Sequence, residues 1–417
     1  MPQTVVIIGG GASGLYASIL LKDAAPDLDV IVLERLERVG KKLLATGSGK
    51  GNLANANIKP SNVSCFNDNE FVAPFIKKYP LATIKKTFLK LGILTTELKD
   101  GRIYPKSESA NSILDAFRLQ MRAKGIKEEC NFEMRRIMKN GDKYIIESTR
   151  GLKVEADYVI VSCGGKSSPM LGSNGTAFEV LRKMKVDVTP TYPGLVGIKT
   201  DENALKGLDG IRLKALVKLF AKKRSEPIYC ESGEIQFKNN ALSGIVIMNI
   251  ESIIARGLVT KDYSSTHLAI NLLPEYDLDG LQELMHQRSI AFHNYANTDF
   301  LIGIFPKMVA QNILKRSRIP LDGYIADLTA KDLERICANI ANWEIIIKDL
   351  ENFEHSQVTV GGVSLVEVNE NLELYKYPNI YLTGEVLNID GLCGGYNLEW
   401  AWVSAMAVVD AIKKRLK

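Results

Sequence analysis

A glycine-rich turn near the N-terminus constrains the fold of this chain more than any other feature. Residues 4–8 form a short apolar run rich in β-branched side chains, which is typical of a strand buried on both faces. The turn G-G-G-A-S-G follows at residues 9–14, and residues 12–22 then carry apolar side chains at helical spacing. A second buried strand is expected at residues 30–33. A strand, a helix and a strand in this order predict an open parallel α/β sheet.

The turn has the spacing G-x-G-x-x-G, and each of the three glycines has its own physical role. Gly9 allows the tight turn, Gly11 lets the backbone approach a pyrophosphate, and Gly14 lets the helix pack closely on the strand. Free N–H groups and the helix dipole favour phosphate at the start of this helix. Glu34 ends the second strand, where its carboxylate can bind ribose hydroxyls. The unit therefore predicts dinucleotide binding.

Two later strands also end in glycine. Residues 158–162 run into a C-G-G turn at 163–165, and residues 379–383 run into Gly384 and Glu385. A glycine in this position is expected where the backbone passes close to a ligand. Both segments resemble the second and third dinucleotide motifs of two-dinucleotide-binding flavoproteins, in which the acidic residue faces the ribityl and pyrophosphate region. Three such elements in this order favour FAD over NAD.

A loop at residues 41–52, K-K-L-L-A-T-G-S-G-K-G-N, has the composition needed to surround the flavin's pyrophosphate and ribityl chain. Its glycines and small polar residues allow close approach, and Lys42 or Lys50 could neutralise phosphate charge. The alternative interpretation is an ordinary solvated loop that is rich in lysine.

Four segments together are similar to one family, the bacterial three-domain flavoproteins known as NAD(P)/FAD-dependent oxidoreductases or aminoacetone-oxidase-like FAD-binding enzymes. The segments are the turn at 9–14, the loop at 41–52, V-T-V-G-G-V at 358–363 and T-G-E-V-L-N-I-D-G-L-C-G-G-Y-N-L-E-W-A-W at 383–402. The resemblance implies a Rossmann-like FAD domain of the two-dinucleotide-binding type, with inserted β-barrel and helical subdomains. Lys50, Gly51 and Ala54 depart from the family's usual Arg, Cys and Thr, so any substrate chemistry of that Cys is absent here.

The resemblance also implies how the C-terminal part meets the cofactor. Residues 391–398 would begin a closing helix whose N-terminus faces the flavin, with N–H groups from Asn397 and Leu398 stabilising the charge of reduced flavin. We predict noncovalently held FAD, no metal, and no identifiable catalytic residue. The predicted cofactor-binding residues are Gly9, Gly11, Ala12, Ser13, Gly14, Glu34, Arg35, Gly40, Lys42, Thr46, Gly47, Gly49, Asn52, Met134, Cys163, Gly164, Gly165, Gly384, Glu385, Gly395, Asn397 and Leu398.

The middle of the chain has a different pattern. Residues 212–222 alternate between apolar and basic side chains, which favours a half-solvated antiparallel strand, and residues 228–237 and 267–272 could join it. From residue 278 to about 352 the pattern is helical, with a capping box expected at 329–332. We predict an FAD-binding domain at 1–190 and 358–417, a β-barrel-like domain at 191–277 and 336–357, and a helical domain at 278–335.

Composition limits the classes of partner. The six cysteines are scattered without a C-x-x-C pair, so reduced cytosolic thiols are expected. No apolar stretch is long enough to span a membrane, and the N-terminal sequence lacks a basic signal region, so we predict a cytoplasmic protein. A net charge of +5 on 417 residues does not by itself call for nucleic acid, and none is expected as a partner. His286 and His293, seven apart on a predicted helix, lack an acidic partner at ligand spacing.

These observations predict an FAD-dependent oxidoreductase that acts on a small organic substrate, as an oxidase or a dehydrogenase, with amines and aminoketones among the candidates. One alternative is an NAD(P)H-dependent flavin reductase; residues 190–357 contain no second G-x-G-x-x-G, so we expect slow or negligible reduction by NAD(P)H. A fumarate-reductase-like flavoprotein is another. The non-enzymatic alternative is an FAD-binding, RNA-interacting protein that uses Lys218, Lys222 and Lys223 on the basic strand.

Overall fold

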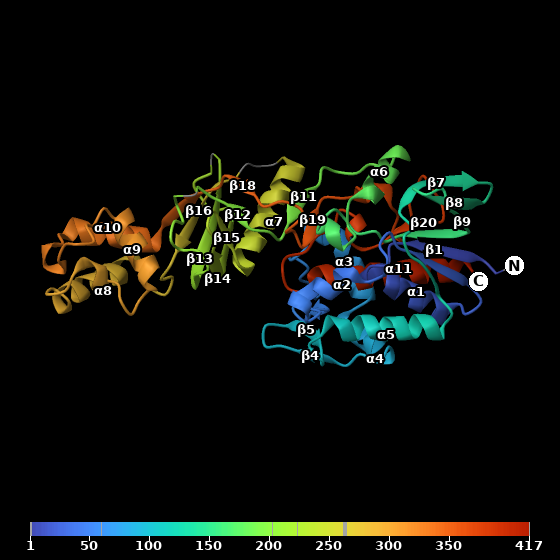
Figure 1. The fold of residues 1–417 in the computed structure, drawn as a ribbon, viewed down its shortest axis with the longest axis horizontal. Helices are drawn as coiled ribbons and strands as arrows, with labels where there is room; N and C mark the ends of the chain where they lie inside the picture. Colours follow the sequence, from blue (N-terminus) through green and yellow to red (C-terminus); the bar gives the residue numbers. More distant parts are fainter. Residues whose placement is uncertain (1, 60, 202, 223, 262–264, 417) are drawn as a thin grey trace. The chain divides into compact units, whose positions relative to one another are not determined.

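The computed structural model describes residues 2–59, 61–201, 203–222, 224–261 and 265–416. The chain divides into two compact units, and Figure 1 shows the fold of each. Unit 1 comprises Met1–Leu195 and Asn352–Lys417, and unit 2 comprises Val196–Glu351. Lys223, one of the basic residues of the RNA hypothesis, lies outside the described residues. The subdivision of the middle region into separate β and helical domains stays a prediction.

Unit 1 is built on the parallel sheet that the N-terminal turn predicted. The strand order is β20-β10-β1-β2-β6, and every neighbouring pair is parallel. Of the two strands that run into the later glycine turns, β10 therefore lies beside β1, the strand of the first turn, and β20 lies on the far side of β10. The strands are β1 (Thr4–Ile8), β2 (Asp29–Leu33), β6 (Lys127–Glu129), β10 (Tyr158–Val161) and β20 (Ile380–Leu382).

Helices and small antiparallel sheets complete unit 1. Helix α11 packs along α1, and Trp402 of α11 lies edge-on to Tyr16 of α1 with a centroid distance of 5.2 Å. Trp400 and Trp402 are both buried in this core. The helices are α1 (Ala12–Ala24), α2 (Lys41–Ala45), α3 (Asn69–Lys78), α4 (Leu81–Lys90), α5 (Ala110–Ala123), α6 (Thr176–Lys183) and α11 (Tyr396–Arg415). The remaining strands are β3 (Ala54–Asn55), β4 (Thr95–Glu97), β5 (Arg102–Pro105), β7 (Met134–Asn140), β8 (Lys143–Ser148), β9 (Lys153–Ala156), β11 (Tyr192–Gly194) and β19 (Val358–Val360).

Unit 2 contains an antiparallel sheet of the order β17-β16-β13-β14-β15-β12-β18. The basic strand is β13, and its alternate residues Ala215, Val217 and Leu219 are buried while the lysines point to the other face, as predicted. The strands are β12 (Ile198–Lys199), β13 (Arg212–Ala221), β14 (Tyr229–Phe237), β15 (Ala241–Ser243), β16 (Ser265–Asn271), β17 (Trp343–Ile346) and β18 (Asp349–Leu350).

The helices of unit 2 agree with the sequence pattern in part. The capping box is present, because the Thr329 hydroxyl accepts from the Asp332 N–H while the Asp332 carboxylate accepts from the Thr329 N–H. The helical pattern predicted to reach about residue 352 was wrong at its end: Trp343 and Ile345 face the core while their neighbours face outward, so the segment forms β17. The helices are α7 (Ile245–Thr260), α8 (Leu278–Ala291), α9 (Lys307–Arg316) and α10 (Ala330–Ala341).

Two further sequence expectations concern histidines and membranes. Helix α8 ends at Ala291, so His293 lies beyond the helix that carries His286, and the two do not share one helical face. Among the residues described, no cluster of His, Cys, Asp or Glu is arranged to hold a metal ion. Within the same residues, every helix is too short or too polar to cross a membrane.

Candidate functional site

The glycine turn after β1 forms an open cradle at the start of α1. Gly9 has φ +110°, and a Cβ atom there would lie 2.5 Å from the Ser162 carbonyl oxygen. A Cβ at Gly14 would lie 2.1 Å from the Gly9 carbonyl oxygen, whereas a Cβ at Gly11 would meet nothing within 4 Å. Gly11 is the N-cap, and no side chain caps the helix. The N-terminus of α1 therefore has no side-chain cap, and the space beside Gly11 is open, which fits a pyrophosphate.

Glu34 lies directly behind this turn. Its carboxylate accepts the Gly10 N–H on Oε2 at 3.0 Å and the Leu36 N–H on Oε1 at 2.8 Å. Burial raises the pKa of this carboxyl, although both N–H groups act in the opposite direction. Beside it, Nη1 of Arg35 is buried without a hydrogen-bond partner. Glu34 thus stabilises the turn through these two hydrogen bonds, and its contact with a ribose stays a prediction. Arg35 has a buried donor that could bind a ligand.

The three glycine motifs meet through hydroxyl groups. Ser162, after β10, and Thr383, after β20, share a hydrogen bond of 2.7 Å between their hydroxyls. The Thr383 hydroxyl also donates to the Ser13 hydroxyl of α1 at 3.2 Å. All three residues are buried. The three motifs therefore meet in one place, because β1, β10 and β20 run parallel in one sheet.

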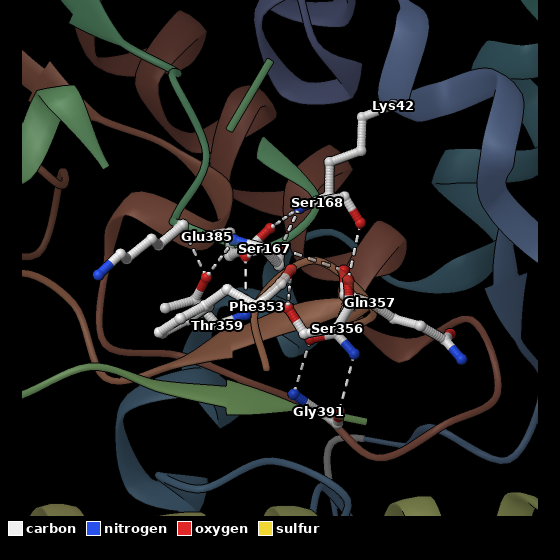
Figure 2. Close-up of polar contacts among 11 residues, drawn as sticks. Lys42, Ser167, Ser168, Phe353, Ser356, Gln357, Thr359, Glu385 and Gly391 are labelled. Atoms are coloured by element: carbon white, nitrogen blue, oxygen red, sulfur yellow. Dashed lines mark hydrogen bonds and ion pairs between the residues drawn. The ribbon is translucent and has the colours of Figure 1, made fainter. Parts of the chain in front are cut away.

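A polar network surrounds Glu385, which lies in the short 3-10 turn η6 (Gly384–Val386). Figure 2 shows that its carboxylate accepts from three directions: the Lys42 ammonium at 2.8 Å, the Ser167 hydroxyl at 2.9 Å and the Thr359 N–H at 2.8 Å. Lys42 also donates to the Ser167 hydroxyl. Sequence reasoning named Lys42 and Glu385 but placed them separately against the cofactor, and it missed Ser167 and Thr359.

The glycines after β10 have a packing role of their own. A Cβ at Gly165 would lie 2.2 Å from the Thr359 hydroxyl oxygen, and one at Gly164 would lie 2.8 Å from the Ser173 hydroxyl oxygen. The Thr359 hydroxyl accepts the N–H groups of Lys166 and Ser167 at 2.7 and 3.1 Å. Protein contacts alone therefore require small residues here, and the contact of these glycines with a cofactor stays a prediction.

Helix α11 begins at a similarly tight corner. Gly395 is its N-cap with φ +100°, and a Cβ there would lie 2.6 Å from the Ala54 carbonyl oxygen and 2.7 Å from Oδ1 of Asn52. The Asn397 side chain closes the preceding loop, because it accepts the Gly391 N–H at 2.8 Å and donates to the Gly391 carbonyl at 2.7 Å. The backbone N–H groups of Asn397 and Leu398 lie in the first helical turn, as the resemblance implied.

The other predicted residues lie in the same unit with varied surroundings. The Lys50 ammonium pairs with Glu108 at 2.9 Å on an exposed surface, so of the two lysines it is Lys42 that joins the polar network. The thiol of Cys163 donates to the Ile8 carbonyl, and burial raises the pKa of this thiol to about 12. Gly40 precedes α2; Thr46, Gly47 and Gly49 form the turn η1 (Thr46–Gly49); Met134 is buried at the start of β7.

Sequence reasoning missed one buried acid, Glu399. Its side chain is fully buried in the first turn of α11, where Oε2 accepts the Asn55 N–H at 3.0 Å and Oε1 has no hydrogen-bond partner. Burial raises the pKa of this carboxyl to about 8. An acid in a first helical turn is ordinary in a sequence, and only the packing of α11 on residues 52–55 makes this one unusual.

Comparison with known proteins agrees with this geometry. The family described as HI0933-like protein Rossmann domain matches residues 3–411. The 3-dehydro-bile acid delta(4,6)-reductase of Clostridium scindens is 31% identical over 412 residues, 98% of each chain, and the ribosomal RNA dihydrouridine synthase of Escherichia coli is 25% identical over 96% of each. The 3-ketosteroid delta1-dehydrogenase of Sterolibacterium denitrificans has the same fold, with a TM-score of 0.50, 10% identity and coverage of 99% of this chain and 100% of that chain. This chain therefore belongs to the HI0933-like family of FAD-binding Rossmann proteins and is an FAD-dependent oxidoreductase.

Proposed function

We propose that this protein saturates a carbon–carbon double bond conjugated to a carbonyl group in a small organic substrate, using noncovalently bound FAD. The observation that carries the proposal is the 31% identity, over 98% of both chains, to a reductase named for such double bonds in a bile acid. We include a cytoplasmic location in the proposal, because six scattered cysteines without a C-x-x-C pair are typical of reducing compartments.

The residues of unit 1 would divide the work as follows. Bound FAD, once reduced by an external donor, would supply a hydride, and the protein supplies binding, orientation and electrostatics. The first turn of α1 would hold the pyrophosphate, Glu34 the ribose, and the pair of Lys42 and Glu385 the middle of the cofactor. The N-terminus of α11 would favour negative charge on the flavin. Saturation adds this hydride to one carbon and a proton to its neighbour, and an external donor must then restore two electrons.

Two measurements test the cofactor part of the proposal. The purified protein should be yellow, and acid precipitation should release FAD into the supernatant, since each contact named above is noncovalent. A flavin that stays in the precipitate would contradict this part. A colourless protein that does not respond to added FAD would contradict the whole proposal.

Substrate class is tested by anaerobic mixing. The dithionite-reduced protein should recover its visible flavin absorbance rapidly with a conjugated 3-keto steroid or a simple cyclic enone, but not with fumarate. The oxidised protein should keep its absorbance with aminoacetone and other amines. Bleaching of the oxidised protein by an aminoketone would instead favour the oxidase interpretation. NADPH and NADH form a further arm, for which we still expect slow reduction because unit 2 lacks a second glycine fingerprint.

A second candidate is reduction of a uracil base in ribosomal RNA. It is favoured by the dihydrouridine synthase relatives, since uracil also carries a double bond conjugated to a carbonyl. On β13 the Phe220 ring stacks on His267 with centroids 4.9 Å apart, beside Lys218 on the same strand face. Aromatic rings with lysines on a sheet face are typical of single-stranded RNA binding.

Salt dependence separates the two candidates. RNA binding through this face should weaken steeply with salt and should fall further in a Lys218→Gln, Lys222→Gln double variant. Absence of any salt-sensitive RNA affinity would remove the second candidate. Tight binding together with lowered dihydrouridine in ribosomal RNA of a deletion strain would favour it over the small-molecule substrate.

A further inference from the structure

Two buried acceptor atoms at the start of α11 lack a donor. Oε1 of Glu399 has no hydrogen-bond partner, and neither does Oδ1 of Asn52, which lies against Gly395. Glu399 is fully buried, and its other carboxyl oxygen receives a single N–H from Asn55 of β3. A buried carboxylate with one hydrogen bond and no cation is strongly disfavoured relative to the neutral acid. The geometry therefore favours a proton on Glu399.

Among the described residues, no cation forms an ion pair with Glu399. Arg102 of β5 lies across the sheet from Asn55, but its guanidinium pairs with Asp100. On its own helix the near titratable group is Tyr396, whose pKa is raised to about 12 chiefly by burial. From β3 the facing group is the Asn55 N–H, and on η6 Glu385 is already paired with Lys42. On α1 the charged residues Lys22 and Asp23 lie near the C-terminal end. Helix α3 has Glu70 in its first turn, an acid that cannot neutralise a second carboxylate, and Lys77 and Lys78 in its last turn, with Lys78 paired to Asp410.

We propose that Glu399 is a proton-holding residue of the flavin site, whose carboxyl group binds a proton when the neighbouring flavin gains negative charge. This inference rests on the placement of the flavin at the N-terminus of α11, and not on the substrate. In the step itself, two electrons enter the flavin from a reductant, dithionite in the test below. One solvent proton forms an O–H bond with the Glu399 carboxylate, and no other bond of Glu399 changes.

The physical basis is reciprocal coupling between two like charges. Negative charge on reduced flavin raises the proton affinity of a nearby carboxylate, so an ionised Glu399 must oppose reduction by the same free energy. Where Glu399 is already neutral, the helix N-terminus stabilises reduced flavin without this opposition. Burial raises the pKa of Glu399 to about 8, so the coupling should become visible above neutral pH.

The test is the midpoint potential of the bound flavin, titrated from about pH 6 to about pH 10. Wild-type protein should take up one more proton per two electrons above about pH 8 than the Glu399→Gln variant, whose amide cannot ionise. Near pH 7 the two proteins should have similar potentials. Asp410→Asn, at the other end of α11, is the matched control and should behave as wild type.

Equal pH dependence in wild type and Glu399→Gln, with FAD fully bound in both, would overturn the proposal. If the variant fails to fold or to bind FAD, infrared difference spectra of the wild-type protein decide instead. Reduction above about pH 8 should then produce the carbonyl band of a neutral carboxylic acid, and its absence would also overturn the proposal. Neither measurement uses a substrate, so failure of the double-bond reductase proposal would leave this test intact.

Discussion

The sequences of units 1 and 2 are constrained in opposite ways: some positions of unit 1 exclude a side chain, and some positions of unit 2 require a buried one. In the glycine turns of unit 1, the backbone takes a path on which a side chain cannot fit: a Cβ at Gly9, Gly14 or Gly165 would lie within 2.5 Å of a protein atom. In the sheet of unit 2, β13 follows residues that must be buried, with Leu219 inside and Lys218 outside.

The difference has a consequence for recognition from sequence. Steric exclusion acts at single positions and admits only glycine, so it leaves a short motif of fixed spacing. Many different apolar side chains can fill the buried positions of a strand, so the sequence shows an alternating pattern there that does not indicate a specific function. The five predictions below test this contrast between the two units, in order of decreasing effect.

The largest combined effect, loss of both FAD binding and stability, is expected at Gly14. Gly14→Ala places a methyl group 2.1 Å from the Gly9 carbonyl oxygen, so the helix must shift, with loss of FAD and about 1–3 kcal/mol of stability. Gly11→Ala is the matched control, since its Cβ meets no protein atom and its φ of −87° suits alanine. That variant should keep its apo melting temperature and still lose FAD affinity, because the methyl group occupies the phosphate approach. Equal FAD affinity in Gly11→Ala and wild type would show that the open cradle is not the phosphate site.

A core substitution in unit 2 should have the converse result. Leu219→Ala removes a fully buried side chain from the hydrophobic core of unit 2. It should cost about 2–5 kcal/mol of stability, measured by denaturant unfolding. FAD should stay bound, as judged by its visible spectrum under native conditions. Lys214→Ala on the exposed face of the same strand should change stability little. Release of FAD by Leu219→Ala would end the contrast between the units.

Glu34→Ala tests a residue with two roles. Loss of hydrogen bonds to a charged group costs on the order of 2–4 kcal/mol, so FAD affinity should fall tens to hundreds of fold in a fluorescence titration. The Gly10 and Leu36 N–H groups would also lose their acceptor, so apo stability should fall in the same variant. Glu34→Gln keeps one acceptor oxygen and should lie between wild type and Glu34→Ala. An unchanged affinity in Glu34→Ala would mean that the ribose lies elsewhere.

Glu399 predicts a pH dependence of stability in the FAD-free protein. Its folded pKa of about 8 is above the ordinary value of 4.5, so its contribution is full below pH 4.5 and is lost as pH rises through about 8. The slope in that window should approach about 1.4 kcal/mol per pH unit. Chemical denaturation at several pH values should show this slope in wild type and a flatter profile in Glu399→Gln. Parallel profiles would mean that the carboxyl group is solvated.

The smallest effect is expected at the capping box of α10. Thr329→Ala removes the hydroxyl that accepts the Asp332 N–H and should lower stability by about 1 kcal/mol. Thr329→Ser retains the cap and serves as the control. Thermal melting of both variants measures the effect, and the flavin spectrum should be the same in both. A loss much above that of a single cap would indicate that unit 2 depends on this helix more than its local contacts suggest.

Much of the fold could be predicted because local patterns carry it. The elements β1, α1, β10, β20 and α11 follow from apolar runs bounded by glycine, β2 follows from the apolar run after Pro26, and β13 follows from alternation. The end of the helical region could not be predicted, because Trp343 and Ile345 fit either a helix or a strand. Pairing with β16 in the folded structure makes this segment a strand.

The sequence itself indicated FAD and the family, since no side chain fits at Gly9 or Gly14 and two later strand–glycine motifs follow in the order typical of FAD-binding proteins. Tertiary structure alone decided which polar groups meet. Lys42 and Glu385 are 343 residues apart in the chain, and Glu399 is 344 residues from Asn55. Such contacts leave no local spacing in the sequence, because the parallel order of distant strands creates them, and the same packing removes water from Glu399 and holds its proton.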